Sequence, residues 1–188
     1  MTATPVSDAQ APLNVRRILR VNHAGEYGAI RIYQSQLLVA RLLAPDLVPF
    51  LTETLSHEIK HRQRFRDLMT PRGVYPCGAL PVWGVGGYAM GLATGVFGRD
   101  AILVCTEAVE RTVHAHLGEQ LASLGNSDEE VASTIRSIQQ EELGHLDHAV
   151  THRASNSPFL RWLSQAISAA TATLIWLSTY GEARFVRR

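Results

Sequence analysis

The chain has 188 residues, of which 46% are hydrophobic, 18 are basic and 17 are acidic. This length and apolar content fit one domain that buries a core without disulfide bonds or structural zinc. The formal charge of +1 gives no overall attraction to nucleic acid, so we expect no nucleic-acid partner. Cys77 and Cys105 form no CxxC pair, which argues against zinc ribbons, rubredoxin-type centres and disulfide scaffolds.

The amino terminus carries no recognisable targeting segment. It lacks the charged start and apolar stretch of a signal peptide, and no arginine precedes Arg16, as one would in a transit peptide. We therefore expect a disordered lead over residues 1–14 and a single domain over residues 15–188.

Apolar residues recur at steps of three and four, and no sustained strand alternation occurs, so the chain is predicted to be all-α. We expect helices over about 15–43, 46–70, 79–97, 100–124, 127–153 and 157–181. Asp46 is the expected cap of the second helix, and Ser127 with Glu130 forms a capping box for the fifth. Ser157, followed by Pro158, is the expected start of the last helix.

One spacing occurs twice in the sequence. Glu58 follows Glu26 by 32 residues, Glu142 follows Glu110 by the same number, and a histidine stands three residues after Glu58 and after Glu142. The second copy is displaced from the first by 84 residues at all three positions. The six residues of the two copies are Glu26, Glu58, His61, Glu110, Glu142 and His145.

The repeated pattern predicts a two-metal site. Residues three apart on a helix share a face, so each Glu-x-x-His is able to hold one metal ion. Two such motifs and one glutamate from each of two further helices are the ligand set of ferritin-like di-metal bundles. Carboxylates and imidazoles suit iron or manganese, and four glutamates balance the charge of two divalent cations. The sequence thus predicts a ferritin-like four-helix bundle with two additional apolar helices. The alternative is a set of solvated polar helix faces, since a single Glu-x-x-His arises often by accident.

Several blocks of the sequence resemble the demethoxyubiquinone monooxygenase family, the ferritin-like di-iron hydroxylases of ubiquinone biosynthesis. The blocks are RVNHAGEYGAIRIY, HEIKH, LPVWGVGGYAMGLATGVFG, CTEAVERTVHAH and QQEELGHLDH. The resemblance implies two iron ions per chain, with the Glu26, Glu58 and His61 set on one side and the Glu110, Glu142 and His145 set on the other, some glutamates bridging. It also implies that one oxygen atom of dioxygen enters the ring of a polyprenylated methoxy-benzoquinol.

Three further residues are candidates for supporting roles. Arg17 and His116 align with family residues that lie near the metal site, and Asp147 is placed to orient a ligating imidazole. At Leu117 the chain departs from the family, which often has a tyrosine there that has been linked to electron delivery. GVGG, residues 84–87, follows no strand and is not a nucleotide-binding motif, so electrons are expected from outside or from the quinol itself.

Two segments, residues 73–98 and residues 162–181, contain no charged side chain. Each is long enough to span a bilayer, but a crossing at 73–98 would separate the two ligand sets. The segments are then interfacial helices, a returning hairpin or buried crossover helices, and aromatic residues such as Trp83 and Trp162 suit an interface. We expect a peripheral protein on the cytoplasmic face of the cell membrane. We also expect it to form homodimers and to associate with other ubiquinone-biosynthesis proteins.

Other functions share parts of this pattern. A ferritin- or rubrerythrin-like ferroxidase or peroxidase uses the same ligands, but the chain lacks rubredoxin cysteines and is very apolar for a storage protein. A di-metal hydroxylase of a tRNA nucleoside would need basic clusters. A non-enzymatic helical protein of the membrane interface would bind no metal at all.

Overall fold

The computed structural model describes residues 11–180, which form six helices with no strand among them. The helices are α1 (Leu13–Leu43), α2 (Val48–Met69), α3 (Leu80–Val96), α4 (Arg99–Leu124), α5 (Glu129–His152) and α6 (Pro158–Tyr180). Short 3-10 turns, Pro45–Leu47 and Thr70–Arg72, flank α2. The all-α prediction is confirmed. The expected lead is too long, because α1 begins directly after Pro12, which occupies its N-cap position; residues 1–10 of that lead lie outside the described range.

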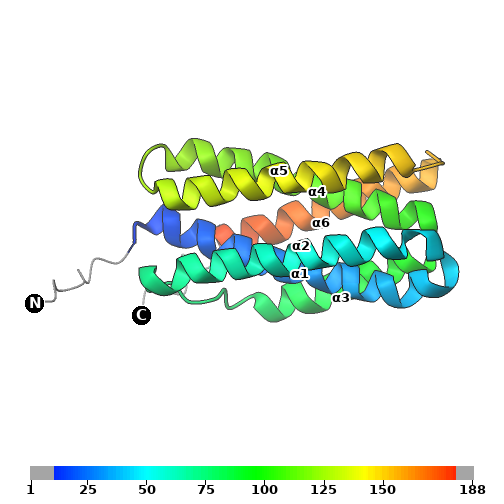
Figure 1. Cartoon of the computed structure of the whole chain (residues 1–188), viewed down its shortest axis with the longest axis horizontal. Coiled ribbons are helices and arrows are strands. Elements are labelled where there is room, and N and C mark those ends of the chain that lie inside the picture. Colours follow the sequence, from blue (N-terminus) through cyan, green and yellow to red (C-terminus); the bar gives the residue numbers. More distant parts are fainter. Residues whose placement is uncertain (1–10, 181–188) are drawn as a thin grey trace, which may run out of the picture.

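Two helical hairpins form the bundle. Helix α1 packs along α2, and α4 packs along α5, each pair joined by a short connection that makes the two helices antiparallel (Figure 1). The hairpins meet through contacts of α1 with α4 and of α2 with α5. The other two helices lie outside: α3 packs mainly on α1, and α6 packs mainly on α4. The predicted four-helix bundle with two additional helices is therefore confirmed.

Glycines on one face of α3 allow that helix to lie directly against α1. A Cβ atom at Gly87 would lie 2.4 Å from the carbonyl oxygen of Gly28, and one at Gly91 would lie 2.2 Å from the carbonyl oxygen of Ile32. Real Cβ atoms do not approach oxygen so closely, so only glycine permits this separation between the helices. The glycine-rich composition of this segment follows from its packing on α1.

The helix caps differ in part from those expected. Asp46 lies inside the 3-10 turn and accepts a hydrogen bond from Arg99 (2.7 Å), so it does not cap α2. Ser127 donates its hydroxyl to the last turn of α4, and Asp128 caps α5 by accepting a backbone amide hydrogen. The expected capping box is wrong by one residue because Asp128 has the extended conformation of an N-cap. Ser157 accepts an amide hydrogen at the start of α6, as predicted.

The two apolar segments lie lengthwise on the bundle. No helix within residues 11–180 has the length and apolar character needed to cross a membrane. Their outer sides nevertheless expose apolar side chains: Val82, Val85, Leu92 and Val96 on α3, and Phe159, Trp162, Trp176 and Leu177 on α6. Trp83 was expected on this surface, but it is buried and donates its indole N–H to Ser178 (2.8 Å).

Candidate metal centre

All six residues of the repeated spacing meet in the centre of the four-helix bundle. Glu26 comes from α1, Glu110 from α4, and each Glu-x-x-His motif from α2 or α5. Every one of the six is buried, with at most 7% of its surface exposed. The fold explains this convergence, because each glutamate faces inward at mid-helix and the two hairpins present equivalent faces to each other.

Glu142 lies between the two histidines. One of its carboxylate oxygens is 3.0 Å from the Nδ1 of His61, and the other is 2.9 Å from the Nδ1 of His145. The Nδ1 of His145 also lies 3.6 Å from Glu58 and 3.9 Å from Glu110. Both imidazole rings therefore direct the same nitrogen into the cluster, where their lone pairs are able to face a cation.

The ligand atoms divide into two groups, in each of which they lie within 4.8 Å of one another. The first group comprises Glu26, Glu58, His61 and Glu142, and the second comprises Glu58, Glu110, Glu142 and His145. Glu58 and Glu142 belong to both. Each Glu-x-x-His motif thus contributes one glutamate to both groups. The division of the ligands that the resemblance implied stays a prediction.

The cluster concentrates negative charge in a buried place. Burial, with the charge of Glu142, raises the pKa of Glu26 to about 7. Burial and neighbouring carboxylates raise the pKa values of Glu58 and Glu110 well above their usual range. Burial opposes ionisation of Glu142 too, but its contacts with His145 and His61 hold the pKa of this carboxyl below the usual range. A divalent cation would relieve the repulsion that raises the other three pKa values.

The donor set fits such a cation. The Nδ1 of His61 and one carboxylate oxygen of Glu58 are buried and make no hydrogen bond of acceptable geometry. Buried polar atoms without partners are rare in folded proteins and point to a ligand, a water or an ion. Two carboxylate–imidazole groups with shared glutamates are the arrangement that iron and manganese favour. The buried cluster is therefore able to hold metal ions.

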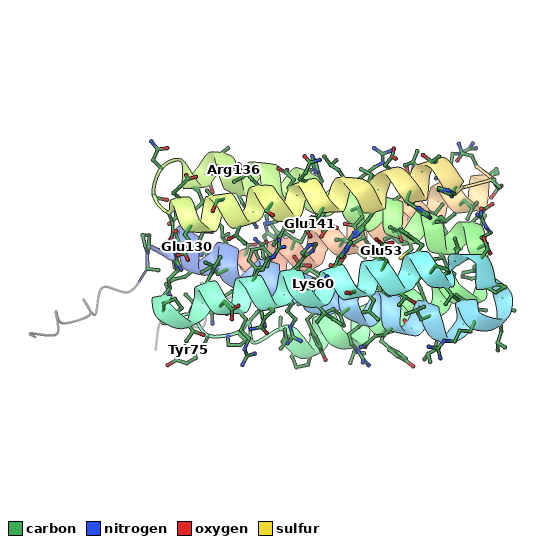
Figure 2. The ribbon with its side chains drawn as sticks, in the orientation of Figure 1. Glu53, Lys60, Tyr75, Glu130, Arg136 and Glu141 are labelled. Carbon is green, nitrogen blue, oxygen red and sulfur yellow. The ribbon has the colours of Figure 1, made fainter. Side chains whose placement is uncertain are left out.

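Two residues outside the repeated spacing contact the outer nitrogens of the histidines. Glu141 lies 3.1 Å from the Nε2 of His61 and accepts a hydrogen bond from Arg64 (2.7 Å). Figure 2 shows Glu141 projecting from α5 toward α2. The Nε2 of His145 lies 3.0 Å from the Nδ1 of His57. Sequence analysis missed both, although each directly precedes the glutamate of a Glu-x-x-His motif.

Asp147 takes no part in these contacts. It is exposed on α5, and the two ring nitrogens of His145 contact Glu142 and His57 instead. The position of Asp147 therefore gives no support to its expected orienting role. Tyr33 is a further residue that sequence analysis missed: it is buried on α1 and donates its hydroxyl to Glu110 (2.8 Å).

An apolar cavity of about 280 Å³ opens onto the cluster. Its floor includes the carboxylates of Glu26, Glu58, Glu110 and Glu142, and its walls come from α1, α4 and the two outer helices α3 and α6. The wall residues are almost entirely apolar or small. A bulky apolar molecule that entered between the outer helices would thus place its end beside the carboxylates.

Comparison with known proteins agrees with this geometry. The model of the family described as Ubiquinone biosynthesis protein COQ7 matches residues 14–178. The chain belongs to this family. The 3-demethoxyubiquinol 3-hydroxylase of Rhodospirillum rubrum is 36% identical over 164 residues, 87% of this chain and 77% of that protein. The mitochondrial NADPH-dependent 3-demethoxyubiquinone 3-hydroxylase of Dictyostelium discoideum is 35% identical over 168 residues, which are 88% of this chain and 76% of that protein. The mitochondrial 5-demethoxyubiquinone hydroxylase of Saccharomyces cerevisiae is 34% identical over 186 residues, which cover 91% of this chain and 79% of that protein.

Membership of the COQ7 family confirms the resemblance and directs attention to His116, Leu117 and Arg17. His116 and Leu117 line the cavity together with the cluster carboxylates, and the Nε2 of His116 is buried without a hydrogen-bond partner. Arg17 lines a separate surface cleft that also includes His116. The supporting roles of Arg17 and His116 stay predictions, with His116 the better placed of the two.

Proposed function

We propose that the protein is a di-iron monooxygenase that hydroxylates the ring of a demethoxyubiquinol with dioxygen, a late step of ubiquinone biosynthesis. The names of its relatives support this reaction. The observation that carries the proposal is the apolar cavity with buried carboxylates at its floor. A ring inserted there lies beside the metal ligands, while its polyprenyl tail remains among apolar side chains.

In this proposal the six cluster residues would hold two iron ions, and Glu58 and Glu142 belong to both candidate groups. When bound, two ferrous ions supply two electrons to the reduction of dioxygen and stabilise the negative charge that develops. Glu141 and His57 contact the Nε2 atoms of the two histidines and so keep their Nδ1 atoms directed into the cluster. The apolar walls exclude water from the reaction.

An electron donor must restore the ferrous ions after each turnover. Residues 84–87, GVGG, lie inside helix α3, so they do not form the strand-to-helix phosphate loop of a nucleotide-binding fold. The relative from Dictyostelium discoideum is named as NADPH-dependent. We therefore propose that the electrons come from an external reductant or from the quinol itself.

The exposed apolar residues of α3 and α6 form a membrane-docking surface in this proposal. A polyprenyl quinol stays in the bilayer, and the cavity is walled by these same two helices. Apolar and aromatic side chains on helices that lie flat suit the boundary between headgroups and acyl chains. Flotation with phosphatidylcholine vesicles tests this docking. Purified protein that neither binds vesicles nor self-associates would argue against both the membrane surface and the expected homodimer.

Labelled dioxygen tests the reaction itself. Ferrous protein, supplied with a short-chain demethoxyquinol and ¹⁸O₂, should introduce one labelled atom into the ring. Iron oxidation without labelled product would favour the ferroxidase alternative. A protein purified without bound iron or manganese, and unable to take up either, would leave only a non-enzymatic role.

Removal of single ligands tests the metal assignment. We expect Glu110→Ala and His145→Ala to lower the metal content and to abolish turnover, while the helical content stays near that of the unchanged protein. Glu53→Ala, which changes an exposed carboxylate on α2, is the matched control and should retain both ions. Full activity in either ligand variant would refute the assignment.

A further inference from the structure

A second cleft, of about 430 Å³, lies on the outer surface between α1 and α2. Three arginines line it, Arg31 from α1 and Arg62 and Arg66 from α2, and no acidic residue is among its lining residues. None of the six cluster residues lines it. It is thus separate from the proposed active site in position and opposite to it in charge.

The three arginines differ from six other arginines within residues 11–180. Within residues 11–180, none of the three forms an ion pair with a carboxylate at 4.0 Å or less. Six arginines elsewhere do contact a carboxylate: Arg64, Arg72, Arg99, Arg111, Arg136 and Arg153. The cleft therefore gathers cations that the protein itself does not neutralise.

Aromatic rings hold two of these guanidinium groups in place. Arg62 stacks over the ring of Tyr27 at 4.5 Å, and Arg31 stacks over the ring of Tyr88 at 4.8 Å. The Nε of Arg62 is buried and makes no hydrogen bond. A buried donor that lacks a partner is expected to meet a ligand or a water. Stacking leaves the edge of a guanidinium group available for hydrogen bonds in its plane. Arg31 uses one terminal N–H to donate to the side-chain oxygen of Gln34 (2.9 Å), and its other N–H groups remain for a ligand.

Electrostatic repulsion within the cleft points to the charge of that ligand. Arg62 and Arg66 stand four residues apart on α2, where like charges destabilise a helix. Burial, together with the charge of Arg66, lowers the pKa of Arg62. His23, fully buried on α1 near both arginines, has a pKa lowered to about 4 by burial and by their charges, and so adds no charge of its own. An anion would relieve the repulsion.

We propose that Arg31, Arg62 and Arg66 bind a phosphate group in this cleft. Guanidinium groups offer paired N–H donors that match two phosphate oxygens, and several of them around one anion are the usual way to hold it. Gln34 and Gln63 also line the cleft. Gln34 accepts a hydrogen bond from Arg31 (2.9 Å), and Gln63 donates one to Asp67 (2.8 Å). A carboxylate ligand would use fewer of the guanidinium donors than a phosphate, which has more oxygens.

The phosphate belongs to a membrane phospholipid or to a small soluble compound. The first source suits the location, because Tyr88 and the exposed Val82 and Val85 lie on the same helix, α3. Arginines at the edge of an apolar surface reach the headgroup region of a bilayer. The proposal does not depend on the proposed reaction, since the cleft shares no residue with the cluster.

Vesicle binding tests the lipid source. The unchanged protein should bind vesicles that contain phosphatidylglycerol more tightly than vesicles of phosphatidylcholine alone. Each lost arginine near a charged surface weakens binding about fivefold, so the double variant Arg62→Gln, Arg66→Gln should lose roughly 25-fold on the anionic vesicles. Its binding to phosphatidylcholine alone should not change. The double variant Arg41→Gln, Arg136→Gln loses the same charge elsewhere on the surface and is the matched control.

Inorganic pyrophosphate, titrated without vesicles, tests the soluble source. Saturable binding that is lost in the Arg62→Gln, Arg66→Gln variant and kept in the control variant would assign the site to a soluble phosphate compound. Selective loss on anionic vesicles alone would assign it to the lipid. Metal content should be the same in all variants. The proposal is overturned when the two double variants behave alike in both titrations.

Discussion

Glu141 and His61 lie 3.1 Å apart, carboxylate oxygen to Nε2, across the contact between α5 and α2. His57 and His145 make the corresponding contact in the other direction, at 3.0 Å. His57 and Glu141 are themselves 84 residues apart, so they occupy equivalent positions in the two copies of the repeat. Each hairpin therefore supports the histidine of the other hairpin. The two supports differ in chemistry, because one is a carboxylate held by Arg64 and the other is an imidazole.

The carboxylate support predicts a measurable effect on metal binding. In Glu141→Gln the amide no longer provides a negative partner for the N–H of His61, so the ring is a weaker ligand. We expect the affinity for ferrous iron to fall about 10- to 100-fold, measured by titration under argon. Asp147→Asn changes an exposed carboxylate on the same helix and should leave the affinity unchanged. Equal affinities for the two variants would contradict the supporting role of Glu141.

The six cluster residues were predictable because helical spacing and an exact repeat encode which side chains share a face. The outer contacts were encoded as well, since His57 and Glu141 keep the 84-residue offset. The supporting role of His57 and Glu141 could not be predicted from the sequence, because an outer hydrogen bond depends on which ring nitrogen of the histidine faces the cluster. That choice follows from the rotation of α2 and α5 about their axes, which tertiary packing sets.

The same repeat relates Tyr33 to Leu117. Tyr33 donates its hydroxyl to Glu110, the glutamate of the opposite copy, and this bond lowers the pKa of Glu110 against the effect of burial. The equivalent partner of position 117 is Glu26, and Leu117 and Glu26 both line the cavity. We expect Leu117→Tyr to donate to Glu26 and to shift the pH midpoint of metal binding downward by about one unit or less.

Leu117→Phe is the control for this substitution, because it adds a ring of nearly the same volume without the hydroxyl. Both variants should narrow the cavity and weaken quinol binding to a similar extent. Only Leu117→Tyr should move the midpoint, which titration of metal binding between pH 5 and 8 measures. A shift of equal size in Leu117→Phe would show that ring volume, not the hydroxyl, is responsible.

Gly25 keeps the cavity open beside the metal ligands. It lines the cavity, and a Cβ atom at this position would meet no atom within 4 Å. Gly25→Ala should therefore fold normally and gain up to about 1 kcal/mol from its higher helix propensity. Gly25→Leu should retain its metal and yet lose activity, since the larger side chain occupies the space of the quinol ring. Steady-state kinetics with metal analysis checks this, and unimpaired turnover of Gly25→Leu would refute the assignment of the cavity.

Gly91 in α3, unlike Gly25, has no room for a side chain. A Cβ atom there would lie 2.2 Å from both the carbonyl oxygen of Ile32 and the hydroxyl of Ser35. Gly91→Ala must move α3 away from α1, which should cost about 1–3 kcal/mol or more. Chemical denaturation should find this variant less stable and Gly25→Ala at least as stable as the unchanged protein. The opposite order would contradict the close packing of α3 on α1.

The close packing of α3 on α1 explains which features of the structure could not be predicted from the sequence. The length and uncharged character of residues 73–98 predicted an apolar helix, but not its depth. Trp83 is buried because the glycines of α3 bring that helix onto α1, so that a Cβ at Gly28 would meet the indole ring at 2.8 Å. The cavity has the same origin. It depends on how far two outer helices stand apart, which involves contacts between residues distant in sequence.

The raised pKa values of the cluster set the pH dependence of the metal-free protein. Glu26 has a pKa of about 7 instead of 4.5, and that of His61 rises to about 9 from 6.5, since Glu142 and Glu26 outweigh its burial. Both groups hold protons in the folded state at pH values where the unfolded chain has released them. Stability from these groups is thus lost as pH rises, through about 7 for Glu26 and about 9 for His61.

The loss from Glu26 is complete by about pH 7, whereas that from His61 continues to about pH 9. We therefore expect the metal-free protein to lose stability between pH 7 and 9, on the order of 2 kcal/mol, through His61. Metal binding releases the same protons, so the stabilisation by ferrous iron should increase over this range. Thermal unfolding of metal-free and iron-loaded protein under argon measures both trends. In Glu110→Gln the neutral amide replaces a carboxyl whose pKa is raised, so the pH dependence of the metal-free form should flatten. A metal-free protein whose stability rose from pH 7 to 9 would show that repulsion among the buried carboxylates is not what metal binding relieves.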